Sequence, residues 1–348
     1  MPTPLRGAFI GEGTLLVRCA ETFLAAGHEI CAVVSAEPLV GRWAEAHQIP
    51  HRSPGGDLLA VLRRRPFDYL FSVANLRVLP KEVLALPRKL PVNFHDSLLP
   101  RYAGLYATSW AILHREKVHG ITWHEMTDRL DEGRILKQRA VPISDDETAF
   151  SLNAKCYEAG VQAFAELVGE LEQGALTQPA PQEPQARTYF PRYLRPPAAA
   201  LVQWEHAADD LNALSRALTF GPYPNPLGLP KIDLGDAVFL APQIAVTEVR
   251  SGAPPGTITG LDAQAVRVAT GTKDVELREL RTIDGRRLEI AELTARYGLR
   301  VGSPLSPRRG RGEEFSGGAA PTKITPPSPW RAGARAAGGG GWGYEGGL

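Results

Sequence analysis

Three polar residues of this chain have the side-chain types needed to move an acyl group between two nitrogen atoms. Asn93 and His95 lie two positions apart in the run Pro91-Val92-Asn93-Phe94-His95, and Asp131 follows 36 positions after His95. An amide can stabilise the oxyanion that forms when an acyl carbonyl is attacked, and an imidazole can carry the proton that the attacking nitrogen loses. We expect the carboxylate of Asp131 to orient that imidazole.

The alternation of apolar and polar residues from 91 to 95 predicts a strand that runs into a loop. A period of two places Asn93 and His95 on the same face of that strand. Strands buried in an α/β sheet are normally apolar on both faces, so two polar side chains there need either partners or a function. The carboxyl ends of such strands are also where open α/β sheets bind ligands.

The first hundred residues alternate short apolar runs with helical patterns, which predicts a parallel sheet built from βαβ units. Strands are expected near 8–10, 30–35 and 69–73, and helices near 15–26 and 58–65. The turn Gly11-Glu12-Gly13 begins like a dinucleotide fingerprint but has Leu16 where the third glycine belongs. It favours a tight turn, while Glu37 leaves a nicotinamide oxidoreductase as an alternative of a different class.

Strand patterns at 120–126 and 134–138 flank Asp131 and place it in a turn between paired strands. A long helical pattern follows at 148–173, and the chain is then rich in proline from 179 to 197. A helix at 207–218 and short strands near 237–249, 256–259, 265–269 and 273–280 predict a small β-barrel. The expected organisation is a catalytic domain (1–188), a linker (189–205), a barrel domain (206–303) and a disordered tail rich in glycine and proline (304–348).

Composition narrows the function classes. With 39 Lys and Arg against 38 Asp and Glu, the formal charge of the 348-residue chain is only +1, which does not favour a surface that coats nucleic acid. Cys19, Cys31 and Cys156 are isolated and odd in number, so we expect buried free thiols rather than disulfides. No run of 18 apolar residues occurs, and we expect a cytoplasmic protein without membrane contact.

Several of these motifs together closely resemble the 10-formyltetrahydrofolate-dependent formyltransferase family, over about residues 7 to 303. The matching segments are 93–104, 110–112, 120–122 and 130–133, with landmarks of a C-terminal domain at 220–224 and 255–258. The resemblance implies a Rossmann-like α/β domain with a mostly parallel sheet, followed by a barrel related to the OB fold. It also implies that 10-formyltetrahydrofolate is the cosubstrate.

The resemblance implies roles for individual residues. Asn93, His95 and Asp131 match the catalytic residues of the family. An α-amine with a pKa of roughly 7.7–8.0 must lose a proton before it attacks a formyl carbon, and an imidazole can take that proton. Taken singly, each residue also has an ordinary structural role, such as a strand-end cap, a core histidine or an Asx turn. Their combination at the family's spacing favours catalysis. Folate contacts are expected from Leu76, Val78, Ser97, Asp128 and Gly133, with ordinary core packing as the alternative for Leu76 and Val78 and a role in loop structure as the alternative for Ser97.

The sequence differs at several positions from the family members that act on initiator tRNA, and these differences bear on the identity of the acceptor amine. Ala103 stands where those members have arginine, Ala107 and Thr108 stand near an expected proline, and segment 36–56 is short and only mildly basic. The chain looks more similar to formylation domains of non-ribosomal peptide synthetases. We therefore expect an aminoacyl group on a carrier protein as acceptor, with initiator methionyl-tRNA as the second candidate and an amino sugar or hydroxylated amino acid as the third.

Other functions fit the residues less well. His114, His119 and His124 are spaced by five residues, which matches neither one helix face nor the usual metal-ligand patterns, so no metal is expected. Ser97 lacks the surroundings of a hydrolase nucleophile. A catalytically inactive docking domain is disfavoured because Asn93, His95 and Asp131 are all present.

Overall fold

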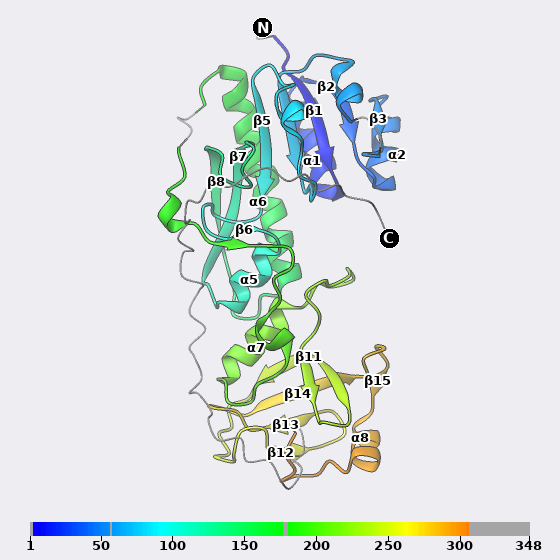
Figure 1. The fold of residues 1–348 in the computed structure, drawn as a ribbon, viewed down its shortest axis with the longest axis vertical. Coiled ribbons are helices and arrows are strands. Elements are labelled where there is room, and N and C mark those ends of the chain that lie inside the picture. Colours follow the sequence, from blue (N-terminus) through cyan, green and yellow to red (C-terminus); the bar gives the residue numbers. More distant parts are fainter. Residues whose placement is uncertain (1–2, 56–57, 177–179, 306–348) are drawn as a thin grey trace, which may run out of the picture.

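The computed structural model describes residues 3–55, 58–176 and 180–305, which form two domains stacked along the long axis of the molecule (Figure 1). Most of the tail predicted at 304–348 lies outside the described residues. Pro304 and Leu305 are described and belong to the second domain, because Pro304 bridges to Thr257 and Leu305 is buried.

The N-terminal domain is built on a seven-stranded sheet of order β3-β2-β1-β4-β5-β7-β8. The strands from β3 to β5 are parallel, and β7 and β8 extend the sheet as an antiparallel pair beside β5. The strands are β1 (Arg6–Gly11), β2 (Glu29–Val34), β3 (His51–Arg52), β4 (Tyr69–Val73), β5 (Leu90–His95), β7 (Val118–Glu125) and β8 (Ile135–Pro142). The predicted turn between paired strands around Asp131 is thereby confirmed.

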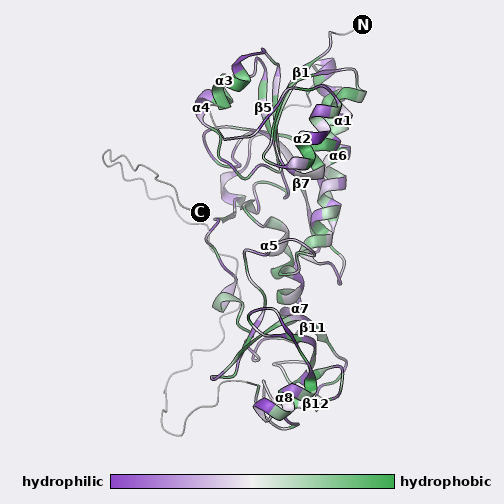
Figure 2. Ribbon diagram, turned by 90° about the vertical axis from the view of Figure 1, so that its right-hand side faces the viewer, coloured by the Kyte–Doolittle hydropathy of each residue, from purple (hydrophilic) through white to green (hydrophobic). Residues whose placement is uncertain are grey.

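Helices cover both faces of this sheet (Figure 2). One face packs against α1 and α6 through a cluster rich in phenylalanine, and Trp123 of β7 donates a hydrogen bond from its indole N–H to the Gly160 carbonyl of α6 at 3.1 Å. A Cβ atom at Gly160 would lie 2.6 Å from the Phe94 ring, so only glycine allows α6 to approach β5 this closely. The helices of this domain are α1 (Gly13–Ala25), α2 (Pro38–Ala46), α3 (Leu58–Arg63), α4 (Lys81–Leu84), α5 (Ala107–Leu113) and α6 (Ala149–Gln173).

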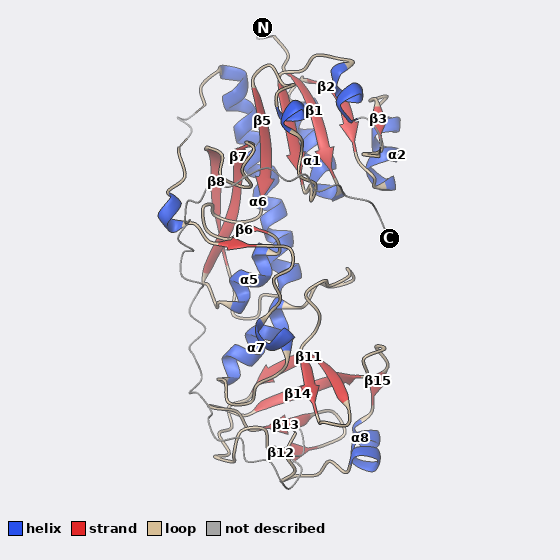
Figure 3. Cartoon of the chain, in the orientation of Figure 1, coloured by secondary structure: helices blue, strands red, loops and turns tan. Residues whose placement is uncertain are grey.

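The second domain is a curled, open half-barrel of antiparallel strands (Figure 3). Its path runs β10-β11-β14-β13-β12, with β15 paired to β14, and Ile244, Val266 and Leu277 lie in its core. The elements are α7 (Ala208–Ala217), β10 (Lys231–Asp233), β11 (Val238–Val246), β12 (Ile258–Leu261), β13 (Val266–Val268), β14 (Val275–Arg281), β15 (Arg287–Leu288) and α8 (Ile290–Tyr297). The predicted fold class, an α/β domain with a mostly parallel sheet followed by a small barrel-like β domain, is confirmed.

The connection between the domains carries more structure than a proline-rich linker suggests. After two short 3-10 turns and a strand, η1 (Pro184–Ala186), β9 (Tyr189–Phe190) and η2 (Pro197–Ala200), the chain enters α7. Strand β9 pairs in parallel with β6 (Ala103–Gly104) of the N-terminal domain. Phe190 stacks on Tyr102 and on Trp110, with ring centroids 5.3 and 5.0 Å apart, so this part of the connection is packed onto the first domain.

Candidate active site

The pairing of β5 with β7 brings the predicted polar residues to one place. In this antiparallel register Asn93 lies opposite His124, and His95 lies opposite Thr122. Partners across a ladder point to the same face, so Asn93, His95 and His124 share one face at the carboxyl end of β5. Asp131 reaches the same place from the turn between β7 and β8. We call Asn93, His95, His124 and Asp131 the catalytic cluster, after the roles that the sequence predicts for Asn93, His95 and Asp131.

The imidazole of His95 is buried and contacts groups on both sides. Its Nε2 lies 2.9 Å from the carbonyl oxygen of Tyr102, and its Nδ1 lies 3.9 Å from Oδ2 of Asp131. A carbonyl oxygen can only accept a hydrogen bond, so Nε2 carries a proton and donates it to Tyr102. Nδ1 is therefore the nitrogen left to accept a proton, and a proton bound there would face a carboxylate.

Asp131 is ionised in this setting although it is 9% exposed. Burial by itself raises the pKa of the Asp131 carboxyl, but the imidazoles of His95 and His124 and the N–H of Gly104 stabilise the carboxylate more strongly and hold its pKa well below the ordinary value. Gly104 N–H donates to Oδ2 at 2.9 Å, and His124 Nε2 lies 3.6 Å from Oδ1. Asp131 is the fixed negative charge of the catalytic cluster.

His124 is a member of the cluster that the sequence did not reveal as a functional residue. Its Nδ1 lies 2.8 Å from the carbonyl oxygen of Glu125 and so donates to it, while its Nε2 lies 3.2 Å from Nδ2 of Asn93. This contact orients the Asn93 amide. The signal that could have found His124 is its position, because a polar residue in β7 directly opposite Asn93 must share its face.

The expected folate contacts lie on loops around this edge of the sheet. Leu76 and Val78 follow β4, the parallel neighbour of β5, and are 64% and 74% exposed. Contact of these two exposed apolar side chains with folate stays a prediction. Asp128 is exposed and pairs with Lys81 at 2.8 Å, which ties the turn after β7 to α4.

Ser97 and Gly133 have clear local roles. The Ser97 side chain is fully buried, and its hydroxyl donates to the carbonyl of Arg101 at 2.7 Å, within the loop that follows β5. At Gly133 a Cβ atom would lie 1.7 Å from the Glu125 carbonyl oxygen, so glycine is required where the turn closes. Contact of either residue with folate stays a prediction.

The glycine turn after β1 is closed by the protein itself. The carboxylate of Glu37 accepts a hydrogen bond from the backbone N–H of Gly13, at the first turn of α1. In a dinucleotide-binding fold a pyrophosphate occupies the N-terminus of this helix. A Cβ atom at Gly11 would lie 1.7 Å from the Val73 carbonyl oxygen, so this glycine serves the close approach of β1 and β4.

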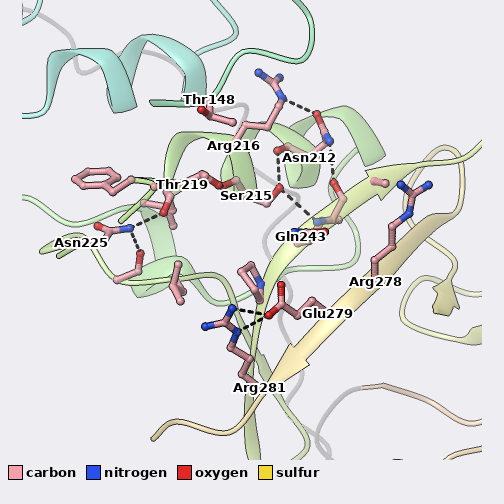
Figure 4. A pocket seen from close by; sticks show the side chains of 18 of the residues that line it. Thr148, Asn212, Ser215, Arg216, Thr219, Asn225, Gln243, Arg278, Glu279 and Arg281 are labelled. Carbon is pink, nitrogen blue, oxygen red and sulfur yellow. Dashed lines mark hydrogen bonds and ion pairs between the residues drawn. The ribbon is translucent and has the colours of Figure 1, made fainter. Parts of the chain in front are cut away.

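A separate cavity of about 670 Å³ lies where the second domain meets α6 (Figure 4). Side chains of α7, β11 and β14 line it together with the turn after α7, which carries the landmark Phe220-Gly221-Pro222-Tyr223-Pro224. Arg281 pairs with Glu279 on its wall, and Thr148, the N-cap of α6, forms part of its rim. We call this the interdomain cavity.

The structure also shows the surroundings of the cysteines and of the histidines considered as metal ligands. The three cysteines are buried free thiols, as expected. His114 contacts the Tyr102 hydroxyl and His119 the Asp96 carbonyl, and the described residues contain no cluster of side chains arranged to hold a metal ion. Within those residues, every helix is too short or too polar to cross a bilayer.

Comparison with known proteins identifies the family. The formyl transferase pattern matches residues 28–168, and the formyl transferase C-terminal domain pattern matches residues 196–298. A methionyl-tRNA formyltransferase of Anaeromyxobacter dehalogenans is 33% identical over 236 residues, covering 63% of this chain and 74% of the relative. The chain belongs to the formyl transferase family. A second methionyl-tRNA formyltransferase, from Acetivibrio thermocellus, is 27% identical over 86% of this chain and 99% of its own length.

Solved structures share the fold of this formyltransferase. An N-formyltransferase from Helicobacter canadensis, in complex with folinic acid and dTDP-3-aminofucose, gives a TM-score of 0.64 at 18% identity, covering 79% of this chain and 99% of that one. The sugar 3N-formyltransferase WlaRD, solved with dTDP and 5-N-formyl-THF, gives 0.63 at 16% identity, with 81% and 99% covered. HypX from Aquifex aeolicus in complex with tetrahydrofolic acid gives 0.59 at 18% identity over 86% of this chain, which spans 48% of that longer protein.

The family assignment confirms the predicted enzyme class and replaces the nicotinamide alternative. The predicted dependence on a formylated folate agrees with the family and with the folates bound in the solved structures of this fold. The two relatives compared by sequence are methionyl-tRNA formyltransferases, and one of the solved structures is a sugar 3N-formyltransferase. The choice of a carrier-protein acceptor is a finer prediction than these comparisons test.

Proposed function

We propose that this formyltransferase moves the formyl group of 10-formyltetrahydrofolate to the α-amino group of an aminoacyl residue held by a peptide-synthetase carrier protein. The convergence of Asn93, His95 and Asp131 at the carboxyl end of β5 is the observation that carries the chemistry. We infer that the enzyme acts in the cytoplasm.

The acceptor amine must be in its neutral form when it attacks, and its nitrogen must then lose one N–H proton. We assign proton acceptance to Nδ1 of His95, since Nε2 is engaged with the Tyr102 carbonyl. The imidazolium that forms lies against Asp131, whose depressed pKa keeps it charged throughout the neutral range. A fixed carboxylate thus stabilises the protonated imidazole at the moment it is needed.

The neutral amine nitrogen forms a bond to the formyl carbon, places negative charge on the formyl oxygen, and gives up one N–H proton to His95. Nδ2 of Asn93 lies 3.2 Å from Nε2 of His124, a contact that orients the amide, and we assign an N–H of this amide to the oxyanion. Collapse of the tetrahedral intermediate breaks the bond between the formyl carbon and N10 of the folate. The proton held by His95 passes to N10, so the products are the formylated amine and tetrahydrofolate.

Support for the acceptor comes from positions that differ from the tRNA-specific pattern. Ala103 is fully buried in β6, and Ala107 and Thr108 are buried in α5, so none of the three offers a charged contact at the surface. The nearly balanced charge of the chain gives no excess to attract a polyanion. Initiator methionyl-tRNA is the second candidate, because the curated relatives act on it by name.

A direct test offers the purified protein each acceptor with 10-formyltetrahydrofolate carrying an isotopic label in the formyl group. The acceptors are aminoacyl carrier protein, initiator methionyl-tRNA and a nucleotide-linked amino sugar. We expect the highest kcat/KM for the carrier protein, and none for the same carrier protein without its aminoacyl group. Transfer to the tRNA but not to the aminoacyl carrier protein would overturn the proposed acceptor.

A further inference from the structure

Two catalytic groups of this enzyme contact backbone atoms that are held by one later part of the chain. That part is residues 180–190, which we call the bracing segment, at the start of the connection to the second domain. We propose that the bracing segment, through Gln182, sets the position of Asp131 and is thereby a determinant of turnover. The inference rests on the catalytic roles proposed above.

The first contact is with the turn that carries Asp131. This residue has a φ of 54°, in the left-handed region that side chains other than glycine adopt at a cost. The Nε2 atom of Gln182 donates to the carbonyl oxygens of Asp131 and Gly133, both at 2.8 Å. One amide nitrogen thus clamps two carbonyls on either side of Glu132 and holds the turn in this conformation.

These two hydrogen bonds fix the orientation of the Gln182 amide. Rotating it by half a turn would bring Oε1 against two carbonyl oxygens, where no hydrogen bond is possible. As it stands, Oε1 is buried and has no hydrogen-bond partner among the described residues. An unpaired buried acceptor is unfavourable, so the two N–H contacts to the Asp131 turn are what this side chain is placed to make.

Arg187 holds the remaining two residues of the same turn. Its Nη2 donates to the carbonyl of Leu130 at 3.1 Å, and its Nε lies 3.4 Å from the carboxylate of Glu132. All four residues from Leu130 to Gly133 therefore contact Gln182 or Arg187.

The second contact is with the segment that binds His95 and Asp131 from the other side. Tyr102 N–H donates to the Thr188 hydroxyl at 2.7 Å, and Ala103 N–H donates to the Thr188 carbonyl at 2.9 Å. The Tyr102 carbonyl accepts from His95, and the N–H of Gly104 donates to Asp131. The bracing segment therefore supports the backbone that contacts His95 and Asp131.

The test compares two glutamines of this segment. Gln182→Met removes the amide at nearly constant size, and Gln185→Met makes the same change at an exposed position three residues away. We expect Gln182→Met to lower kcat on the order of 10²-fold, because small misplacements of catalytic groups cost about that much, while the Kd for a folate analogue is unchanged. Gln185→Met keeps the wild-type kcat.

A positioning role predicts two results that a general loss of packing does not. The pH–rate profile of Gln182→Met moves toward that of Asp131→Asn, and Gln182→Met has little further effect when added to Asp131→Asn. Gln182→Glu, which keeps the shape but loses both N–H donors, behaves like Gln182→Met. Thermal unfolding of each variant identifies the temperature at which all are folded.

The catalytic role of Asp131 and the positioning role of Gln182 can be disproved separately. Full activity of Asp131→Asn would overturn the catalytic assignment on which the inference rests. Impaired Asp131→Asn with wild-type kcat in Gln182→Met and Gln182→Glu would overturn the positioning role alone. The positioning role would also be overturned if Gln182→Met weakened folate binding and lowered kcat equally in the wild-type and Asp131→Asn backgrounds.

Discussion

The catalytic cluster and the interdomain cavity are both lined by polar side chains, but they hold those side chains differently. In the cluster, two buried imidazoles flank one buried carboxylate, and each ring also donates to a backbone carbonyl. In the cavity, Arg281 pairs with Glu279, and Tyr223 is 66% exposed. Buried groups with fixed partners suit chemistry, whereas exposed groups with movable partners suit contact with a second molecule.

This difference predicts that the two regions contribute to different properties of the enzyme. Changes in the cluster should alter turnover and its pH dependence, and changes in the cavity should alter the binding of the acceptor.

His95→Ala should lower turnover by roughly 10²–10⁴-fold, the usual contribution of a positioned general acid and base. Binding of a folate analogue should be nearly unaffected, since the proton is moved only during transfer. Steady-state kinetics and a binding titration of the same preparation measure the two quantities. Full activity of this variant would remove His95 from the mechanism.

Asp131→Asn should lower kcat on the order of 10²-fold, because the imidazole loses the group that orients it. The acid limb of the pH–rate profile should also flatten or move to lower pH, since protonated His95 is no longer faced by a carboxylate. An unchanged profile would point to another orienting group.

The depressed pKa of Asp131 also predicts how stability depends on pH. An unfolded carboxyl titrates near about 3.9, so the unfolded state binds more protons than the folded state as the pH falls below that value. The stabilisation by Asp131 is therefore present above about pH 4 and is lost at lower pH. Urea unfolding from pH 5 down to 2.5 should show a steeper loss of unfolding free energy in the wild type than in Asp131→Asn. Parallel curves would contradict the assigned cause of the shift.

Tyr223→Ala should raise the KM for a macromolecular acceptor roughly 5-fold, as expected for the loss of about 1 kcal/mol from an aromatic contact residue. Its kcat and pH profile should match those of the wild type, because Tyr223 packs beside Phe150 and not in the cluster. Tyr193→Ala is the matched control, since Tyr193 is 80% exposed and does not line the cavity. A lower kcat in Tyr223→Ala would contradict the prediction that the interdomain cavity affects only the binding of the acceptor.

Local patterns were sufficient to predict much of this molecule. Strand β4 matches the predicted strand at 69–73, and helix α6 begins one residue after the predicted start at Thr148, which caps it. These elements have strong periodicity or capping residues, and both signals act over a few residues. The roles predicted for Asn93, His95 and Asp131 rest on their side-chain types, on the period of two that places Asn93 and His95 on one face, and on the family's spacing.

The features that were missed depend on contacts between distant segments. His124 joins the cluster only because β7 pairs with β5 in a register that places it opposite Asn93. Gln182 reaches the Asp131 turn across 51 residues of sequence, from a segment that reads as a proline-rich linker. Helix α8 was missed because a segment of eight residues is short for recognising helical spacing. Register and long-range side-chain contacts have no local signal.

We propose that Asn93, His95 and Asp131 act as one unit, and a single-turnover assay with labelled 10-formyltetrahydrofolate tests this proposal. The rates of the three single alanine variants are compared with that of the triple variant. Because groups that act together are not additive, the triple variant should be about as slow as the slowest single variant, while it still binds a folate analogue. Losses that multiply across the three variants, or a triple variant that still transfers the formyl group at the wild-type rate, would contradict the claim.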